Sequence, residues 1–254
     1  MNLKKEIIDC GLYLQKEGLV ARTWGNISAR NSDEDFYITP SGKAYDITEE
    51  KDIALVKIED TSYDKNGPKP SSEKGVHAIA YKNRKDINYI IHTHQLYASA
   101  ICANEKDITL SDGTVVPCCA YGLPGTAKLK KGFEEKVLQY PEANIFLLAK
   151  HGTVIFGKTM KEAKDRANYL EKECKKIFDE KVKDFKVLDN LPPYLDDYAQ
   201  MFPAQADEDK EALDMVKEKN ARACAYADVK PMGFLDKTIQ HLVYVNKYSK
   251  LKGK

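Results

Sequence analysis

Apolar residues recur at helical spacing at the start of the chain and again past its middle. From Leu3 to Leu14 they fall three or four residues apart, and Gly18 follows where such a helix would end. A capping box, Thr159-Met160-Lys161-Glu162, precedes a longer stripe of the same kind that runs to Ile177. The pattern therefore predicts an amphipathic helix at each of these two places.

Short apolar runs closed by turn residues predict β-strands between these helices. The expected strands cover residues 36–39, 53–56, 87–91, 144–149 and 153–156. Further helices are expected near residues 73–83, 97–103, 126–140 and 208–221. The last two strands are joined at Lys150-His151-Gly152, which places His151 on a sharp bend.

Length and charge narrow the kinds of partner that the chain can have. Its 254 residues can bury one full core, so we expect a single domain over residues 1–254. Residues 183–254 are charged and interrupted by Pro192-Pro193, and we expect them to form a C-terminal extension. Because 40 Lys and Arg side chains nearly balance 39 Asp and Glu, no long-range field favours nucleic acid or a membrane surface. Small-molecule partners are expected instead.

Two further features bear on the location of the protein. No apolar stretch reaches the length of a signal peptide or of a membrane span, so we expect a cytoplasmic protein. The six cysteines include no CxxC pair, and Cys10, Cys102 and Cys174 occupy apolar positions of predicted helices. Reduced, buried thiols are therefore expected.

Three histidines and one glutamate are candidates for a metal site. His92 and His94 follow the strand at 87–91 and point to the same side, because side chains alternate along a strand. Neutral imidazole is a natural ligand for a borderline cation such as zinc, and His151 and Glu73 would complete a tetrahedron. Glu73 is expected in the first turn of the helix at 73–83, with Ser71 or Ser72 capping it.

Each of these residues also has a simpler interpretation. His92 and His94 alone could be satisfied core or surface residues at a strand end. Glu73 could be a first-turn carboxylate that only interacts favourably with the helix dipole. The other two histidines, His77 and His241, are interpreted as structural.

Small polar and glycine positions are candidates for binding an anion. They can present backbone amides and hydroxyl groups, and a helix that begins near residue 73 would add a favourable dipole. Ordinary turns and helix caps are the alternative interpretation. The candidates are Gly25, Asn26, Ser41, Gly42, Ser71 and Ser72.

Five ordered motifs resemble those of the class II aldolase and adducin-related family, to which the fuculose-phosphate aldolases belong. The resemblance covers residues 3–178. It implies an α/β fold with three layers, α/β/α, a central, mostly antiparallel sheet and a homotetramer with sites near subunit interfaces. The motifs are Gly25-Asn26-Ile27-Ser28, Ile38-Thr39-Pro40-Ser41-Gly42, Pro70-Ser71-Ser72-Glu73, His92-Thr93-His94 and His151-Gly152.

The resemblance also implies a reaction. The metal would be zinc, with manganese or cobalt as alternatives, and the six anion-site candidates would bind the phosphate of a sugar phosphate. Glu73 would contact the metal in the empty enzyme and act as the general base once substrate displaces it. The expected activity is reversible cleavage of a ketose 1-phosphate, of the fuculose or 5-deoxypentulose type, to dihydroxyacetone phosphate and an aldehyde. Relatives that epimerise pentulose phosphates carry aspartate at the position of Glu73.

Other activities stay open at this stage. A pentulose-phosphate 4-epimerase or a methylthioribulose-phosphate-type dehydratase would keep the metal, and an adducin-head-like interaction module would be non-catalytic. The segment from Asp107 to Val116 lacks the tyrosine that protonates the departing aldehyde in the aldolases. Tyr121 is one possible substitute. Other candidates lie in the extension: Tyr194, Tyr198, Tyr226, Tyr244 and Tyr248.

Overall fold

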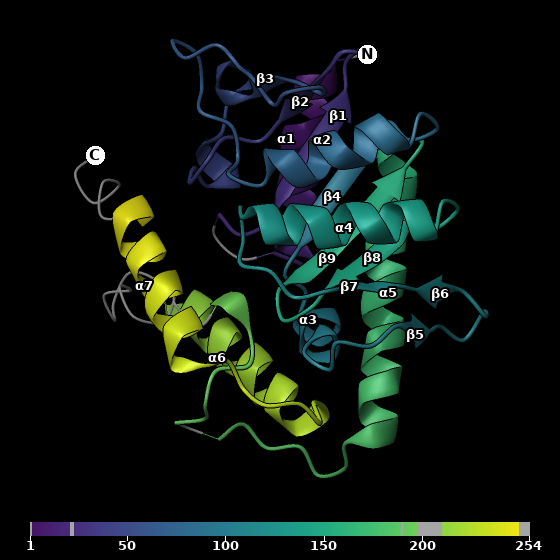
Figure 1. Ribbon diagram of the computed structural model, residues 1–254, viewed down its shortest axis with the longest axis vertical. Helices are drawn as coiled ribbons and strands as arrows, with labels where there is room; N and C mark the ends of the chain where they lie inside the picture. The colour runs from purple at the N-terminus through teal and green to yellow at the C-terminus, as the bar shows by residue number, and fades with distance from the viewer. Residues whose placement is uncertain (1, 21–22, 189, 198–209, 249–254) are drawn as a thin grey trace.

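A seven-stranded sheet forms the centre of the molecule in the computed structural model, which describes residues 2–20, 23–188, 190–197 and 210–248 (Figure 1). The strand order is β3-β2-β1-β4-β9-β8-β7. Every pairing is antiparallel except that of β7 with β8, which confirms the expected mostly antiparallel sheet. The strands are β1 (Asn26–Arg30), β2 (Asp35–Ile38), β3 (Ala54–Lys57), β4 (Tyr89–Thr93), β7 (Cys118–Cys119), β8 (Ile145–Leu148) and β9 (Gly152–Gly157).

Helices cover both faces of this sheet. Because side chains alternate along each strand, neighbours such as Ile90 and Ile91 enter two different cores. The core that contains Ile91 is covered by α1 (Leu3–Lys16), α3 (Leu96–Cys102) and α5 (Met160–Lys181). The core that contains Ile90 is covered by α2 (Lys74–Asn83) and α4 (Ala127–Gln139), which lie in front of the sheet in Figure 1. The three-layer α/β/α arrangement is therefore confirmed.

Capping residues mark the start of α1 and of α5. Asn2 accepts a hydrogen bond from the amide of Lys5, and Gly18 takes a φ of +70° just after α1 ends. Thr159 caps α5 by accepting from the amide of Glu162. The Glu162 carboxylate accepts from the amide of Lys158 instead of that of Thr159, so the second half of the expected capping box is shifted by one residue.

The smaller elements connect these layers. Two short 3₁₀ helices, η1 (Tyr45–Ile47) and η2 (Glu50–Asp52), precede β3. The strands β5 (Ile108–Thr109) and β6 (Val115–Val116) pair as a separate hairpin. The described helices contain none that is long and apolar enough to cross a membrane. All six cysteines are free thiols, and five of them are buried.

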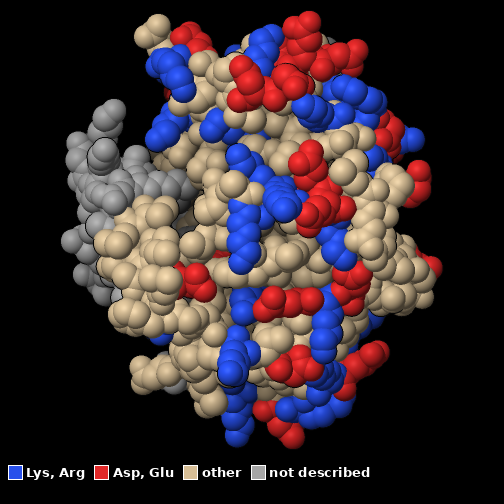
Figure 2. Space-filling model, in the orientation of Figure 1, with Lys and Arg blue, Asp and Glu red and all other residues tan. Residues whose placement is uncertain are grey.

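Two C-terminal helices lie outside the layers that cover the sheet, and the first of them packs beside α3. They are α6 (Lys210–Tyr226) and α7 (Phe234–Tyr248), drawn in yellow-green and yellow in Figure 1. Ala223 of α6 packs with Ala100 and Ala103 at the end of α3. The helix expected at 208–221 is thus present and continues to Tyr226; its expected start lies outside the described residues. On the face shown in Figure 2, acidic and basic side chains are intermixed.

The middle of the sheet sets the position of the candidate residues. Asn26 on β1 lies opposite His92 on β4, and Thr93 lies opposite Thr153 on β9. Gly25 precedes β1 with a φ of +89°, and a Cβ there would lie 2.6 Å from the His92 carbonyl oxygen. Only glycine allows the chain to pass so close to β4 in this conformation.

We expect Gly25→Ala to lower the free energy of unfolding by more than about 2 kcal/mol, because it combines a left-handed φ with a backbone clash. Gly18→Ala is the matched control, since Gly18 also has a positive φ of +70° but a Cβ added there would have no atom within 4 Å. It should lose only about 1–2 kcal/mol. Urea unfolding of both variants measures the difference, and equal losses would contradict the close approach.

Candidate active site

The three predicted histidines meet at one end of the central strands. His92 and His94 come from the end of β4, and His151 comes from the turn between β8 and β9, where Lys150 has a φ of +57°. Each pair of rings lies with centroids 4.8–4.9 Å apart. The Nε2 atoms of His92 and His94 are 3.0 Å apart, which confirms that both side chains point to the same side of the strand.

Glu73 faces this cluster from the start of α2. Its Oε2 lies 3.1 Å from Nε2 of His92, and its Oε1 lies 3.4 Å from Nε2 of His151. The prediction that Glu73 lies in the first helical turn is wrong: α2 begins at Lys74, and Glu73 is its N-cap residue with non-helical backbone angles. Ser71 Oγ accepts from the Glu73 amide rather than from the helix, so it fixes the turn that presents the carboxylate.

The four side chains can hold a metal ion. One possible ligand atom from each lies within 4.8 Å of all the others. A tetrahedral site with bonds of about 2.0–2.1 Å needs ligand atoms about 3.3 Å apart. The Glu73 oxygens lie at similar distances, 3.1 Å from Nε2 of His92 and 3.4 Å from Nε2 of His151. Nδ1 of His92 donates to the Thr153 carbonyl oxygen at 2.8 Å, which leaves its Nε2 lone pair for a cation. The buried Glu73 Oε1 also has no hydrogen-bond partner.

The protonation states suit such a site. Burial lowers the pKa of His94 to about 4 and that of His151 to about 3, so both imidazoles are neutral at neutral pH. Burial would raise the pKa of Glu73, but His92 and His151 hold it well below its usual range. Burial lowers the pKa of His92, but the adjacent Glu73 carboxylate raises it above its ordinary value. At neutral pH the cluster therefore contains an ionised Glu73 carboxylate beside the neutral imidazoles of His94 and His151.

A buried chain of hydrogen bonds supports Glu73 from behind. Asn26 Nδ2 donates to Glu73 Oε2 at 3.0 Å, so the Asn26 Oδ1 atom is left to accept from Nε2 of His77. His77 Nδ1 then accepts from the Ser28 hydroxyl at 2.6 Å, and Ser28 also contacts the Tyr81 hydroxyl. His77 is structural, as predicted, but the orienting role of the Asn26 side chain was not foreseen.

A cleft of about 90 Å³ opens beside the cluster. Glu73, His94 and His151 form one part of its lining, and Trp24 and Pro124 contribute apolar surface. All six predicted anion-site residues line the same cleft: Gly25, Asn26, Ser41, Gly42, Ser71 and Ser72. The structure thus brings the two groups of candidates together, although they come from five separate stretches of the sequence.

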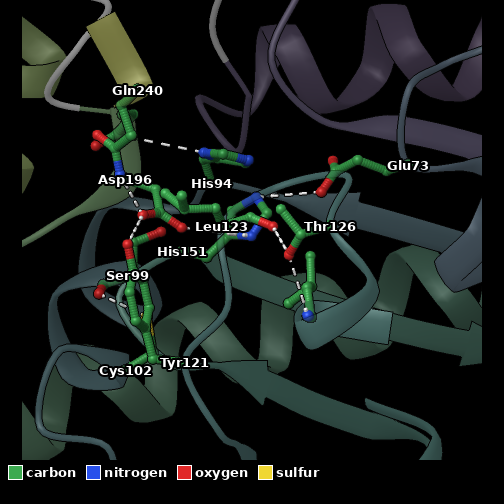
Figure 3. A network of polar contacts seen from close by, with 12 residues as sticks. Glu73, His94, Ser99, Cys102, Tyr121, Leu123, Thr126, His151, Asp196 and Gln240 are labelled. Carbon is green, nitrogen blue, oxygen red and sulfur yellow. Dashed lines mark hydrogen bonds and ion pairs between the residues drawn. The ribbon is translucent and has the colours of Figure 1, made fainter. Parts of the chain in front are cut away.

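Figure 3 shows Glu73, His94 and His151 turned toward one another, with Tyr121 and Asp196 on the far side of His151. The Tyr121 hydroxyl donates to Asp196 Oδ1 at 3.0 Å, and Tyr121 is absent from the lining of the cleft. The structure therefore does not support Tyr121 as the residue that protonates the departing aldehyde. Of the extension's tyrosines, Tyr198 lies outside the described residues.

Residues 5–177 match the family described as the class II aldolase and adducin N-terminal domain. The chain belongs to this family. It is 31% identical over 189 residues to a probable L-ribulose-5-phosphate 4-epimerase of Mycoplasma pneumoniae, with 67% of this chain and 78% of that protein covered. It is also 31% identical over 182 residues to a 5-deoxy-D-ribulose 1-phosphate aldolase of Bacillus thuringiensis, covering 69% and 83%.

The fold is similar to that of solved family members. A solved L-fuculose 1-phosphate aldolase superposes with a TM-score of 0.64 and 25% identity, covering 85% of this chain and 95% of that chain. A divalent metal is used by class II aldolases, and the cluster of Glu73 with three histidines is the corresponding metal site here. The similarity supports an aldolase-type enzyme without fixing which sugar phosphate it uses.

The stability of the metal-free protein should depend on pH through His77. Burial lowers its pKa to about 3, against about 6.5 in the unfolded chain. Between these two pKa values only the unfolded chain binds the proton. The contribution of His77 to the free energy of unfolding is therefore fully present above pH 6.5 and is lost as the pH falls. From pH 7.5 to 5.0, wild type should lose about 2 kcal/mol more than His77→Gln, which keeps an amide donor for Asn26. Urea titrations at both pH values measure this, and equal losses would contradict a buried neutral His77.

Proposed function

We propose that the protein is a metal-dependent aldolase that reversibly cleaves a ketose 1-phosphate to dihydroxyacetone phosphate and an aldehyde. The observation that carries this proposal is the position of the Glu73 carboxylate. It lies against His92 and His151 and also lines the cleft that contains the anion-site candidates. A base, a set of metal ligands and donors for a phosphate therefore share one cleft.

His92, His94 and His151 would hold zinc together with Glu73, and manganese or cobalt could occupy the same donor set. A bound divalent cation would polarise the substrate's ketone oxygen and stabilise the negative charge that develops on it. The residues themselves supply orientation. Each histidine presents Nε2 to the cluster, and the Asn26 amide holds one Glu73 oxygen at 3.0 Å.

Glu73 is the proposed general base. In the condensation direction its carboxylate takes a proton from the carbon next to the ketone, and that carbon then forms the bond to the aldehyde. In the cleavage direction the hydroxyl group that becomes the aldehyde loses its proton as the carbon–carbon bond breaks, and the protonated carboxyl group of Glu73 delivers a proton to the carbon next to the ketone. A carboxylate is a weak base for this step, so it depends on the polarised ketone.

The substrate phosphate is proposed to lie among the small residues of the cleft. Gly25 and Gly42, with φ values of +89° and +73°, leave backbone groups uncovered beside the cavity. Ser71 precedes α2, so an anion nearby would also meet the positive end of the helix dipole. The names of the relatives favour a fuculose-type or a 5-deoxypentulose phosphate as substrate.

An epimerase that acts on a pentulose phosphate is the second candidate, because one of the similar proteins is named as a probable ribulose-5-phosphate 4-epimerase. Glutamate at position 73 favours the aldolase, since the resemblance implies aspartate in epimerases. Product analysis separates the two, because only the aldolase releases dihydroxyacetone phosphate. The complete ligand set also favours an enzyme over a non-catalytic interaction module.

The organisation of the chain is part of the proposal. We propose one domain over residues 1–254, with residues 183–254 as a C-terminal extension, and a homotetramer as the resemblance implies. The cytoplasmic location expected from the sequence stays a prediction.

Glu73→Gln should lower kcat at least a hundredfold, because it removes the base while keeping the size of the side chain. Bound metal should stay near one ion per chain, since the three histidines are unchanged. Release of dihydroxyacetone phosphate, followed with a coupled dehydrogenase, measures the loss. Glu59→Gln is the control, because that carboxylate is 81% exposed and should not affect turnover. Substantial cleavage by the Glu73→Gln variant would remove Glu73 from the mechanism.

Ser41→Asp should raise KM for the phosphorylated substrate about tenfold or more, because it sets a negative charge against the phosphate. Inhibition by inorganic phosphate should weaken in parallel. Ser62→Asp introduces the same charge at an exposed position outside the lining of the cleft and should leave both constants unchanged. If Ser41→Asp changes neither constant, the phosphate lies elsewhere.

A further inference from the structure

A histidine that binds a metal through one nitrogen holds its orientation through the other, which donates to a carbonyl or carboxylate oxygen. For His92 this partner is the Thr153 carbonyl oxygen. The Nδ1 atoms of His94 and His151 are buried and have no hydrogen-bond partner. A carboxylate from the extension lies near each of them: Asp197 Oδ2 is 3.8 Å from His94 Nδ1, and Asp196 Oδ2 is 3.8 Å from His151 Nδ1.

The extension is fixed to the turn that carries His151. The Asp196 amide donates to the carbonyl oxygen of Lys150 at 2.7 Å, one residue before His151. Asp196 Oδ1 accepts from the Tyr121 hydroxyl at 3.0 Å and from Gln240 Nε2 at 2.5 Å (Figure 3). These bonds leave Oδ2 of Asp196 buried, without a hydrogen bond and on the side of His151.

Asp197 is held from the opposite side by α6. Its carboxylate is paired with the ammonium group of Lys219, and both side chains are fully buried. Lys219 Nζ also lies 5.2 Å from the centre of the Trp24 ring, which lines the cleft. Trp24 in turn packs against Ala212 and Val216 of α6. The extension is thus connected to both the metal cluster and the wall of the cleft.

Two adjacent buried carboxylates need more donors than these contacts supply. Burying a charged group costs several kcal/mol unless it is paired and hydrogen-bonded. Oδ2 of Asp196 and Oδ1 of Asp197 each lack a hydrogen bond. Both rings carry Nδ1–H when Nε2 binds a cation, so they can donate to these carboxylates. His151 faces the unbonded Oδ2 of Asp196, and His94 faces Oδ2 of Asp197, which also accepts from Lys219.

We propose that Asp196 and Asp197 are positioning residues for the metal site. Each accepts from Nδ1–H of one histidine and so keeps the Nε2 lone pair of that ring directed at the ion. This inference rests on the proposed metal-dependent function. It also assigns a role to the extension, since both residues lie beyond the family match, which ends at residue 177.

Asp196→Asn tests the proposal most simply, because Asp196 has no cation that would be left unpaired. If the oxygen of the new amide keeps the hydrogen bonds from Tyr121 and Gln240, the NH₂ group of the amide faces Nδ1–H of His151. Two donors then face each other, and no hydrogen bond can form between them. The dissociation constant of Zn²⁺, measured by competition with a chelator, should rise about 10–100-fold. The visible spectrum of the Co²⁺-loaded protein should also change. Asp196→Glu, which restores a carboxylate, should recover most of the affinity.

A second variant tests Asp197. Asp197→Asn/Lys219→Met removes both buried charges together and should also weaken Zn²⁺ binding about 10–100-fold. Asp228→Asn is the control in the same extension, because that carboxylate is 58% exposed and pairs only with Lys106 among the described ion pairs. Its Zn²⁺ affinity should equal that of wild type.

Thermal unfolding of the metal-free proteins separates positioning from packing. A packing role would lower the melting temperature of Asp196→Asn and leave its Zn²⁺ dissociation constant and Co²⁺ spectrum unchanged, and that result would overturn the proposal. If Asp196→Asn does not fold, the same two measurements on Asp197→Asn/Lys219→Met decide between positioning and packing. Failure of wild type to bind Zn²⁺ would instead overturn the proposed function.

Discussion

The register between β1, β4 and β9 is the constraint on which the site depends. It sets Asn26 opposite His92 and Thr93 opposite Thr153. Because side chains alternate along a strand, a slip of one residue would turn His92 to the other face of the sheet. The apolar neighbours prevent this slip, since Ile90 and Ile91 belong to separate cores on opposite faces. Packing in the two cores therefore fixes the position of the metal ligands.

Burying the polar groups of the site lowers the stability of the protein unless these groups find partners. Three buried imidazoles and a buried carboxylate would be unfavourable in a core without partners. The protein meets part of that need with fixed acceptors and donors: Thr153 for His92 and Asn26 for Glu73. Glu73 Oε1, which is buried without a hydrogen bond, faces His151. A cation would satisfy it, so the site and its ligand are expected to stabilise each other.

Local rules were sufficient for part of the fold and of the site. Alternation along one strand places His92 and His94 on one side, apolar spacing and Gly18 locate α1, and the Thr159 cap locates α5. The same rules failed at Glu73, because its turn is set by Ser71 and by the histidines rather than by helix propensity. The meeting of Glu73 with His151 joins residues far apart in the chain. Residue type suggested both as ligands, but no local rule places them side by side.

Other features had no signal in the sequence. Asn26 was expected to bind phosphate, yet its amide also orients Glu73, which depends on the pairing of β1 with β4 and on the buried His77. The Leu195-Asp196-Asp197 segment has the composition of a surface loop. Its burial follows from the Lys219 ion pair and the packing of α6, which no local pattern predicts.

Glu73, His92, His94 and His151 are proposed to form one metal centre. X-ray absorption spectroscopy on the zinc-loaded protein can decide this, because it reports the type and distance of the ligands. We expect one ion per chain with three imidazoles and at least one oxygen at about 2.0–2.2 Å. Zinc without imidazole ligands, or no stoichiometric binding, would contradict it.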